Sequence, residues 1–374
     1  MCNFVSKSQF VSELLTITWD VGKGIPIGGF TLRFYQLLFA SGFILGYYIM
    51  LGFLKREGLG QELLDKLLTY MVIATIIGAR LGHVFFYQWD YYSQHPADIF
   101  KVWEGGLASH GAAIAIIIGM YIFSKRVSKR SSLWILDKVV VTVALAGCLI
   151  RMGNFFNSEI YGQRANSAIE TVYTDLPRQA LLKYPAWEKY LESVEFESLG
   201  TNLETDSIRY PEYRMSLYFS GELTEEQVDL VTRRQINYLN GFPREDENIF
   251  VQYPSGELPE FSIQGDPASG WTAQLIVQGV PRYPTQLIEA FGYLLVFIIL
   301  YLMYVRDAWK KEGLLFGSFL VLVFGFRFFV EFLKVVQVEA EKDMSYNLGQ
   351  SLSIPLVIVG LFFIIRALRQ KSLA

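Results

Sequence analysis

The chain contains few of the residues on which disulfide-rich, metal-binding and soluble proteins depend. Only 18% of its 374 residues are charged, and it has two cysteines and three histidines. A soluble domain carries about a quarter charged residues, so the deficit indicates a surface that faces lipid. Cys2 and Cys148 cannot build a disulfide framework, and Cys148 lies in an apolar run, which argues against a redox or zinc role. The composition excludes a disordered, collagen-like or nucleic-acid-binding chain.

Several catalytic motifs are missing as well. The sequence has no G-x-S-x-G nucleophile elbow, no H-E-x-x-H zinc site, no P-loop and no Asp-rich metal motif. An enzyme built on this chain is therefore expected to supply neither a nucleophile nor a metal ion of its own, and no cofactor is expected.

Apolar and aromatic side chains are abundant. Hydrophobic residues make up 52% of the chain and aromatic residues 16%, and the mean hydropathy is +0.29. A helix needs roughly 20 residues to cross about 30 Å of hydrocarbon. Seven apolar segments approach or exceed that length, at residues 29–54, 67–89, 107–124, 133–157, 285–305, 313–332 and 348–365. The sequence therefore predicts an all-α polytopic membrane protein with seven transmembrane helices.

The basic residues of the connections predict how these helices are oriented. Lys and Arg are retained on the cytoplasmic side of a membrane. One alternate set of connections, together with the C-terminus, holds 13 Lys and Arg, whereas the other set holds 5 when the long segment is left out. This asymmetry predicts an N-terminus outside and a C-terminus in the cytoplasm.

A long polar segment separates the fourth and fifth predicted helices. Residues 162–281 hold 19 Asp and Glu against 9 Lys and Arg. Thr224, followed by two glutamates and a glutamine, is a capping-box pattern that opens a helix, and Gly241 can end it. The runs NIFVQY and AQLIVQG are typical of short strands. We expect a small α+β head outside the membrane, with residues 1–161 forming the first four transmembrane helices and residues 282–374 the last three.

Apart from Asp137 and Lys138 near the cytoplasmic edge, the ionisable residues inside the predicted spans fall toward the outer face. A charge at membrane depth costs about 2.5 to 3.5 kcal/mol on insertion scales, so each is expected to be paired, functional or close to the interface. Arg33, one turn from the edge of the first span, is expected to snorkel to the interface. For Arg80 the structural and the functional interpretation are equally good.

Two further arginines predict an anion site. Arg151 and Arg327 lie near the outer ends of two spans, with Glu289 and Glu331 as nearby carboxylates. Guanidinium forks bind phosphate well, and the phosphate available at this depth is that of a phospholipid head group in the outer leaflet.

His110 is the candidate acid–base residue. It lies in the segment WEGGLASHGA, whose glycines let the backbone approach a ligand closely. A histidine at a helix start is more often structural than catalytic. A neutral imidazole at this position can nevertheless take a proton near pH 7.

The segment RMGNFFNSEIYG, residues 151–162, carries the most informative polar pattern. Asn154, Asn157 and Glu159 are spaced as neighbours on one helical or turning face, among aromatic residues typical of a membrane interface. An ordinary polar helix end has the same pattern, so these residues do not by themselves define a site.

The same segment resembles the signature of the prolipoprotein diacylglyceryl transferase family. The segments GARLGHVFFY, KVWEGGLASHGA, RYPTQLIEA, FRFFVEF and GQSLSIP resemble the other blocks of that family, in order and in matching spans. The resemblance implies a multi-pass protein of the bacterial inner membrane with its active site toward the periplasmic leaflet. It also implies transfer of a diacylglyceryl group from phosphatidylglycerol to the thiol of the lipobox cysteine in a prolipoprotein signal peptide, with glycerol phosphate as the other product.

Matching motifs assign expected roles to particular residues. By motif, the residues that resemble the family's functional residues are Tyr35, His110, Arg151, Asn154, Glu159, Gly162, Arg327 and Glu331. We expect Arg151 and Arg327 to hold the head-group phosphate, and His110 either to deprotonate the thiol or to position the head group. Tyr35, Arg80, Asn154, Glu159, Gly162 and Glu331 are expected to assist substrate binding.

A transporter or scramblase for an anionic lipid or solute is the alternative, because buried arginines also line such pathways. It predicts basic residues through both halves of the membrane. The inner half of the spans lacks them apart from Lys138, which stands beside Asp137 near the cytoplasmic edge.

Overall fold

The computed structural model of the chain divides into two compact units. It describes residues 16–101, 105–106, 108–165, 167, 169–184, 189–205, 208–241, 250–253, 259–335, 344 and 346–370. What we call the head unit comprises Met1–Leu38, Ile150–Ala290 and Phe329–Gly349. What we call the bundle unit comprises Phe39–Leu149, Phe291–Phe328 and Gln350–Ala374.

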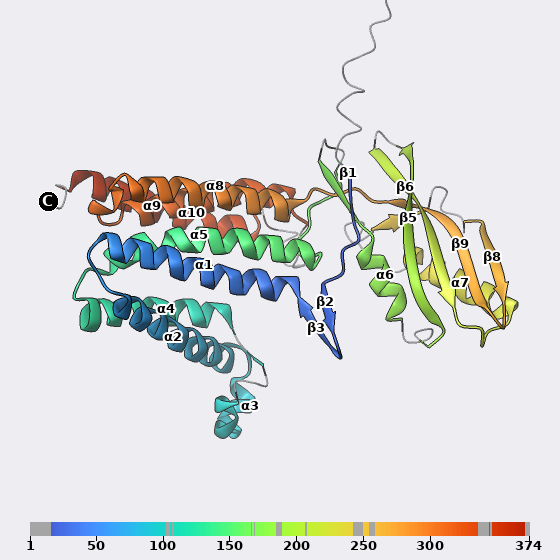
Figure 1. The fold of residues 1–374 in the computed structure, drawn as a ribbon, viewed down its shortest axis with the longest axis horizontal. Coiled ribbons are helices and arrows are strands. Elements are labelled where there is room, and N and C mark those ends of the chain that lie inside the picture. Colours follow the sequence, from blue (N-terminus) through green and yellow to red (C-terminus); the bar gives the residue numbers. More distant parts are fainter. Residues whose placement is uncertain are drawn as a thin grey trace, which may run out of the picture. The chain divides into compact units, whose positions relative to one another are not determined.

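Seven helices in the described part of the chain are long and apolar enough to cross a membrane, which confirms the predicted number. They are α1 (Phe34–Arg56), α2 (Gln61–Tyr87), α4 (Ser109–Phe123, continued by a π-helical turn to Ser128), α5 (Ser132–Phe156), α8 (Thr285–Val305), α9 (Leu314–Val330) and α10 (Leu348–Arg369) (Figure 1). Helix α2 begins six residues before the predicted start, because its first turns are polar but still helical. Leu107, where the third span was predicted to begin, lies outside the described residues.

The predicted start of the first helix at residue 29 is wrong, because the chain forms a β-hairpin there. Strand β2 (Gly24–Ile27) pairs antiparallel with β3 (Phe30–Arg33). Gly28 has φ +61° in the turn, a backbone conformation that glycine adopts without steric cost. Arg33, predicted to lie just inside the first helix, is instead the exposed last residue of β3.

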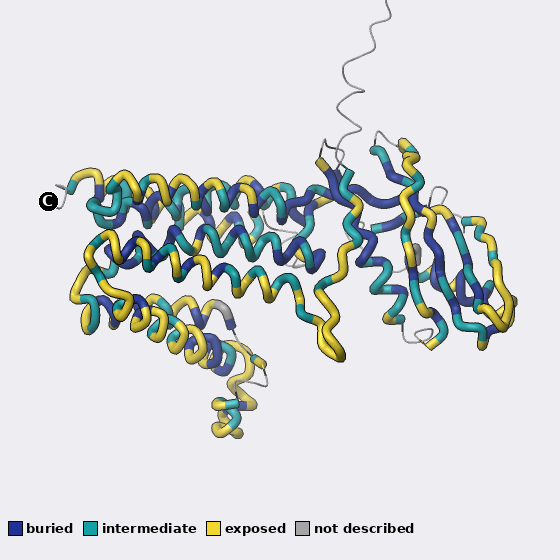
Figure 2. The backbone as a smooth tube through the Cα atoms, in the orientation of Figure 1, coloured by how far each residue is buried: buried dark blue, intermediate teal, exposed yellow. Residues whose placement is uncertain are grey.

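Large apolar side chains are exposed along the helices of the bundle unit, as the exposed positions of α1 and α2 in Figure 2 illustrate. On α1, the exposed fractions of Phe43, Ile44 and Tyr48 are 56%, 58% and 67%. Extended apolar surfaces of this kind are rare on soluble monomers. On helices of this length they are suited to contact with lipid chains, as expected for a multi-pass membrane protein.

Helices α2 and α4 pack through glycines in the bundle unit. A Cβ atom added at Gly82 would lie 2.7 Å from the Cα of Gly111, so the two backbones approach as closely as helices can. The backbone N–H of Ala108 donates to the carbonyl of Ala79 at 2.9 Å, just before α4 begins. These contacts fix the start of α4, which carries His110, against α2.

The head unit contains an antiparallel sheet of five strands (Figure 1). Its strands are β5 (Leu191–Thr205), β6 (Ile208–Phe219), β9 (Gly270–Gly279) and β7 (Val251–Gln252) in spatial order, with β8 (Phe261–Asp266) also paired to β9. Tyr213, Met215 and Leu217, at alternate positions of β6, are fully buried, as one face of a strand should be. They share a hydrophobic core with Val228 and Ile236 of α7 (Glu225–Gly241).

The predictions for the polar segment are confirmed in part. The backbone N–H of Thr224 donates to Oε1 of Gln227 at 2.9 Å, and the N–H of Gln227 donates to Oγ1 of Thr224 at 3.4 Å, which is the predicted capping box. Helix α7 ends at Gly241, as predicted. The run AQLIVQG lies in β9, whereas only Val251–Gln252 of NIFVQY is a strand, and residues 248 and 249 lie outside the described residues.

The N-terminal part of the chain also joins the head unit. Strand β1 (Thr16–Trp19) pairs in parallel with β4 (Glu170–Tyr173), which leads into α6 (Asp175–Leu182). Trp19 packs against the rings of Phe155 and Phe156 at the end of α5, with centroids 4.1 and 5.3 Å apart. These ring contacts fix the end of α5 against β1.

A buried charged network in the bundle unit connects the C-terminal ends of α1 and α8 with the N-terminal end of α5. The carboxylate of Glu57 lies 3.0 Å from Nζ of Lys138 and accepts hydrogen bonds from Nε1 of Trp134 at 2.8 Å and from the hydroxyl of Tyr304 at 2.9 Å. Next to it, Asp137 accepts the backbone N–H groups of Gly313 and Phe316, and so caps the N-terminus of α9. Lys138, the one basic residue in the inner half of the predicted spans, is thus neutralised by a carboxylate.

Candidate active site

The last turn of α5 and the residues after it form a polar turn in the head unit. The carboxylate of Glu159 accepts hydrogen bonds from the side-chain amides of Asn157 at 3.3 Å and Asn154 at 3.5 Å. Ser158 and Ile160 have φ values of 54° and 57°, a left-handed conformation that non-glycine residues rarely adopt and that surrounding structure must stabilise. The predicted neighbourhood of the two asparagines and Glu159 is therefore present, as a turn rather than as a continued helix.

The start of α8 holds this turn in place. The amide of Gln286 donates to the carbonyl of Glu159 at 2.6 Å, and the hydroxyl of Thr285 donates to the carbonyl of Ile160 at 2.9 Å. Both donors are fully buried. Two buried side chains thus satisfy the backbone of the strained segment, which fixes where the Glu159 carboxylate lies.

Arg151 belongs to a buried chain of alternating charges. Its Nε lies 3.0 Å from Oε2 of Glu289, whose other oxygen lies 3.0 Å from Nζ of Lys334. Lys334 also lies 2.9 Å from Oε1 of Glu331, and the Asn347 amide donates to that carboxylate at 3.4 Å. The side chains of Glu289 and Lys334 are 0% and 6% exposed, so these charges are stable at this depth only because each has an opposite partner.

The geometry of Arg151 leaves it able to bind an anion. Glu289 contacts it through Nε, and Nη1 approaches Oδ1 of Asn154 at 3.4 Å. Its side chain is 15% exposed, whereas that of Glu289 is fully buried. A guanidinium presents five N–H donors, so Glu289 can orient the group from behind while its accessible edge meets a ligand.

Tyr35 and Gly162 are held by close contacts in the same unit. A Cβ atom added at Gly153, between Arg151 and Asn154, would lie 2.7 Å from Cδ2 of Tyr35, so the Tyr35 ring packs directly on the α5 backbone. A Cβ added at Gly162 would lie 2.6 Å from Cβ of Tyr283 and 2.9 Å from the carbonyl oxygen of Leu333. Gly162 is therefore a packing position, where the chain leaving α5 crosses two other segments.

The guanidinium of Arg80, in the bundle unit, donates hydrogen bonds to backbone carbonyls of the segment between α3 (Trp89–Gln94) and α4. Arg80 is 3% exposed and donates to the carbonyls of Asp98 and Gly105 at 2.6 Å and of Ile99 at 2.8 Å. Its guanidinium also lies over the ring of Tyr92, 5.0 Å from the centroid. These contacts favour the structural interpretation of Arg80, which organises the glycine segment ahead of His110.

His110 lies in the first turn of α4, as predicted, and its side chain is exposed. The rings of Phe86 and Tyr87, at the end of α2, flank it with centroid distances of 5.1 and 5.6 Å. His83 on α2 instead lies with its Nε2 3.1 Å from Oε1 of Gln88. An exposed imidazole beside aromatic rings at a helix start is accessible to a ligand.

Comparison with known sequences places the chain in a family. The sequence model described as prolipoprotein diacylglyceryl transferase matches residues 24–366. The chain belongs to the prolipoprotein diacylglyceryl transferase family. Three relatives named phosphatidylglycerol–prolipoprotein diacylglyceryl transferase come from Tolumonas auensis, Chloroherpeton thalassium and Porphyromonas gingivalis. They are 30%, 31% and 32% identical to the chain over 93%, 96% and 94% of its length, and the matches cover 96%, 96% and 95% of their own lengths.

The structure brings together only part of the motif residues that resemble the family's functional ones. The head unit contains Tyr35, Arg151, Asn154, Glu159, Gly162 and Glu331. The bundle unit contains Arg80, His110 and Arg327, the last on α9 one turn before Glu331. A shared phosphate site of Arg151 and Arg327 therefore stays a prediction. Within the described ranges, no three His, Cys, Asp or Glu side chains gather in a way that could hold a metal ion.

Sequence reasoning missed Lys334 as a member of the site. In the sequence Lys334 is one of the five basic residues of the outer connections, whereas in the structure it joins the carboxylates of Glu289 and Glu331. The available signal was its spacing from Glu331, because residues three apart on a helical turn face each other.

Gly162→Ala is expected to destabilise the head unit by about 1 to 3 kcal/mol, the usual cost of overpacking, because the added methyl group collides with Tyr283 and the Leu333 backbone. The midpoint of thermal unfolding in detergent measures this loss. Gly22→Ala is the matched control, since a Cβ there meets nothing within 4 Å. Equal midpoints for Gly162→Ala and the wild-type protein would refute the packing role.

Asp175 accepts a hydrogen bond from Ser158 of the polar turn and makes the stability of the head unit depend on pH. Burial raises the pKa of its carboxyl, although the hydrogen bond from Ser158 at 2.8 Å works in the opposite direction. The folded protein therefore holds this proton more tightly than the unfolded chain does. The resulting stabilisation is complete below the ordinary aspartate range and is lost as pH rises through the raised pKa.

Asp175→Asn is accordingly expected to lose less thermal stability than the wild-type protein when the pH rises from about 4 to 7. Unfolding midpoints at several pH values in that interval measure the effect. Asp229→Asn, on the exposed ion pair with Arg233, makes the same chemical change and should leave the wild-type slope intact. A slope for Asp175→Asn as steep as that of the wild type would contradict the assignment.

Proposed function

We propose that the chain transfers the diacylglyceryl group of phosphatidylglycerol to the thiol of the lipobox cysteine in a prolipoprotein. The observation that carries this proposal is the family match over residues 24–366, which includes every residue of the candidate site. The relatives are transferases named for these two substrates. The thiolate sulfur forms a bond to the primary carbon of the diacylglyceryl group, the bond from that carbon to the phosphate oxygen breaks, and glycerol phosphate leaves with the electron pair.

Charge on the departing phosphate is the main electrostatic demand of this reaction. Arg151 stabilises this charge through the part of its guanidinium that is not in contact with Glu289, while Glu289 orients the group through Nε. Arg327 supplies the second guanidinium, so that the phosphate is held in a two-armed clamp. Lys334 completes the buried charge chain by bridging the carboxylates of Glu289 and Glu331.

The thiol must lose its proton before it attacks. A free thiol, with a pKa of about 8.5, is only a few per cent ionised at neutral pH. His110 acts as the base, because its imidazole is exposed at the start of α4. Arg80 acts on His110 indirectly, by fixing the preceding glycine loop. Asn154, Glu159 and Tyr35 orient the groups around the phosphate.

The proposed orientation follows from the distribution of basic residues. The N-terminus and the head formed by residues 162–281 lie on the periplasmic side of the bacterial inner membrane, and the C-terminus lies in the cytoplasm. Residues 1–161 and 282–374 form the flanking transmembrane parts. The reaction takes place at the periplasmic leaflet, where secreted prolipoproteins emerge.

Mass spectrometry of a lipobox peptide tests the proposed activity. The peptide is incubated with the purified protein and phosphatidylglycerol, and a gain of one diacylglyceryl unit on the cysteine is expected. A peptide with Ser in place of Cys should stay unmodified. No mass gain on the cysteine peptide, with a folded protein, would refute the proposal.

Transport or scrambling of an anionic lipid is not favoured. The matched family and its named members are transferases. Lys138, the one basic residue that a pathway through the inner half could use, is bound by Glu57 and is 1% exposed.

A further inference from the structure

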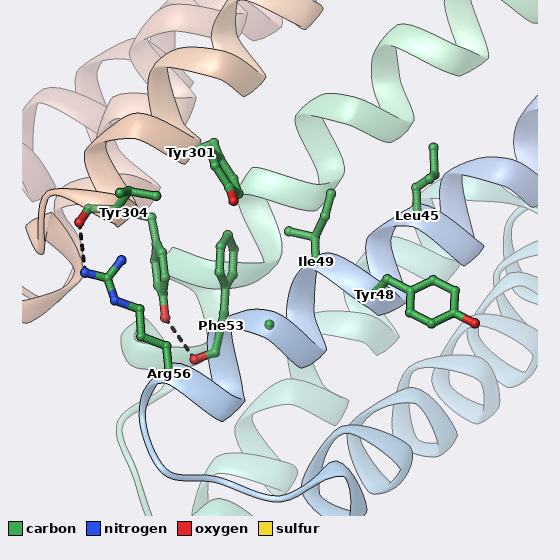
Figure 3. A pocket seen from close by; sticks show the side chains of 9 residues that line it. Leu45, Tyr48, Ile49, Phe53, Arg56, Tyr301 and Tyr304 are labelled. Atoms are coloured by element: carbon green, nitrogen blue, oxygen red, sulfur yellow. Dashed lines mark hydrogen bonds between the residues drawn. The ribbon is translucent and has the colours of Figure 1, made fainter.

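A groove opens between α1 and α8 in the bundle unit, near the C-terminal ends of both helices (Figure 3). Its volume is about 380 Å³, within the range of small-molecule sites. The absence of a side chain at Gly52 helps to open it, because a Cβ there would meet nothing within 4 Å. Leu45 and Tyr48, 45% and 67% exposed, lie along the same side of α1, which indicates that the groove faces the bilayer.

One wall of the groove is rigid. The rings of Phe53 and Tyr304 stack with centroids 3.7 Å apart. The hydroxyl of Tyr304 donates to the carbonyl of Phe53 at 3.1 Å and to the buried carboxylate of Glu57 at 2.9 Å (Figure 3 shows the first of these bonds). The wall therefore exists before any ligand binds, which lowers the entropy cost of binding.

A fixed cation marks the end of the groove. Nη2 of Arg56 donates to the carbonyl of Val305 at 2.9 Å and to Oδ1 of Asp307 at 3.0 Å. These contacts use one nitrogen of a group with five N–H donors, and the side chain is 41% exposed. Lys55 and Arg306, neighbours of Arg56 and Val305 in the sequence, are also exposed. Despite Asp307, this end of the groove is rich in positive charge.

We propose that this groove binds one anionic phospholipid, distinct from the substrate, with its phosphate at Arg56 and one acyl chain running along α1 toward Leu45. Arg56 comes 11 residues after Leu45, a rise of about 16 Å along a helix, which is about half of the hydrocarbon thickness and so the depth of one leaflet. Basic pockets between transmembrane helices on the cytoplasmic side recognise anionic head groups. In the proposed orientation this end of α1 faces the cytoplasm, and the lipid seals the seam between α1 and α8.

Photo-crosslinking in nanodiscs tests this site. The full-length protein is reconstituted in phosphatidylcholine with a small fraction of phosphatidylglycerol that carries a diazirine on one acyl chain, and labelled peptides are identified by mass spectrometry. Peptides with residues 45–56 and 301–305 should be labelled. A diazirine near the glycerol should label close to Arg56, and one near the chain terminus close to Leu45. The same diazirines on phosphatidylcholine should label these peptides at least about fivefold less, because phosphatidylcholine has no net negative charge.

Two variants with matched controls separate the acyl-chain contact from the head-group contact. Gly52→Leu fills the groove and is expected to reduce labelling at least about fivefold, whereas Ala40→Leu on another exposed position of α1 should not. Arg56→Gln is expected to weaken competition by unlabelled phosphatidylglycerol about tenfold. Arg366→Gln, an exposed arginine at the C-terminal end of α10, is its control.

Labelling of these peptides that is unchanged by Gly52→Leu, or equal for the two lipids, would overturn the proposal. If a variant does not fold, competition on the wild-type protein decides: unlabelled phosphatidylglycerol must displace the label and unlabelled phosphatidylcholine must not. Transferase activity is measured in the same nanodiscs. An active enzyme without labelled groove peptides refutes only the lipid site, and labelled peptides without activity leave the lipid site standing.

Discussion

Replacing Arg151 by alanine is expected to lower the rate of diacylglyceryl transfer by about 10²- to 10³-fold, the usual effect of removing a group that stabilises developing charge. The side chain is held by Glu289 at 3.0 Å, with its remaining donors available to the phosphate. Arg151→Lys keeps a positive charge but loses the planar fork, so its loss should be smaller yet clear. The measurement is the initial rate of peptide lipidation at saturating phosphatidylglycerol.

The two Arg151 variants also separate chemistry from folding. Alanine leaves the fully buried Glu289 with Lys334 as its remaining cation among the described partners, which lowers stability as well as activity. Lysine retains a cation for Glu289, so a folded but slow Arg151→Lys enzyme isolates the effect on phosphate. Arg366→Ala, on an exposed arginine, is the control. Near-wild-type rates in a folded Arg151→Ala enzyme would remove the clamp from the mechanism.

Replacing His110 by glutamine is expected to lower the transfer rate by about 10²- to 10⁴-fold, the range that general base catalysis contributes. A general base must be unprotonated to accept the thiol proton, so the wild-type rate should rise with pH. The His110→Gln enzyme should instead follow the ionisation of the free thiol alone. Rates of peptide lipidation between about pH 5.5 and 9 measure both effects.

The pH profile distinguishes the two roles considered for His110. A group that only positions the lipid head group would lower the rate in the glutamine variant but leave the shape of the profile unchanged. His83→Gln is the matched control, because His83 contacts Gln88 and lies outside the proposed machinery. An unchanged profile in a slowed His110→Gln enzyme would exclude the base and leave the positioning role.

The sequence predicted the membrane helices well, because apolar length alone specifies them. It failed at the hairpin of residues 24–33, where Phe30 and Leu32 continue the apolar run of α1 into a strand. The Gly28–Gly29 pair was the overlooked turn signal. In the head, the charged and largely exposed β5 has no clean alternation, so hydropathy could not reveal it.

Motifs predicted which residues belong to the candidate site, but not all of the hydrogen bonds and ion pairs that connect them. Local spacing gives the contacts of Glu159 with Asn154 and Asn157. The ion pairs of Glu289 with Arg151 and Lys334 join segments far apart in the chain, so they depend on tertiary packing that no local pattern encodes. The hydrogen bonds from Arg80 to the carbonyls of Asp98, Ile99 and Gly105 likewise depend on tertiary structure.

The most direct test of the mechanism is a structure of the enzyme with phosphatidylglycerol bound. We expect the head-group phosphate to lie within about 2.7 to 2.9 Å of guanidinium nitrogens of both Arg151 and Arg327, with Glu289 still in contact with Nε of Arg151. A phosphate bound by only one of these arginines, or by neither, would contradict it.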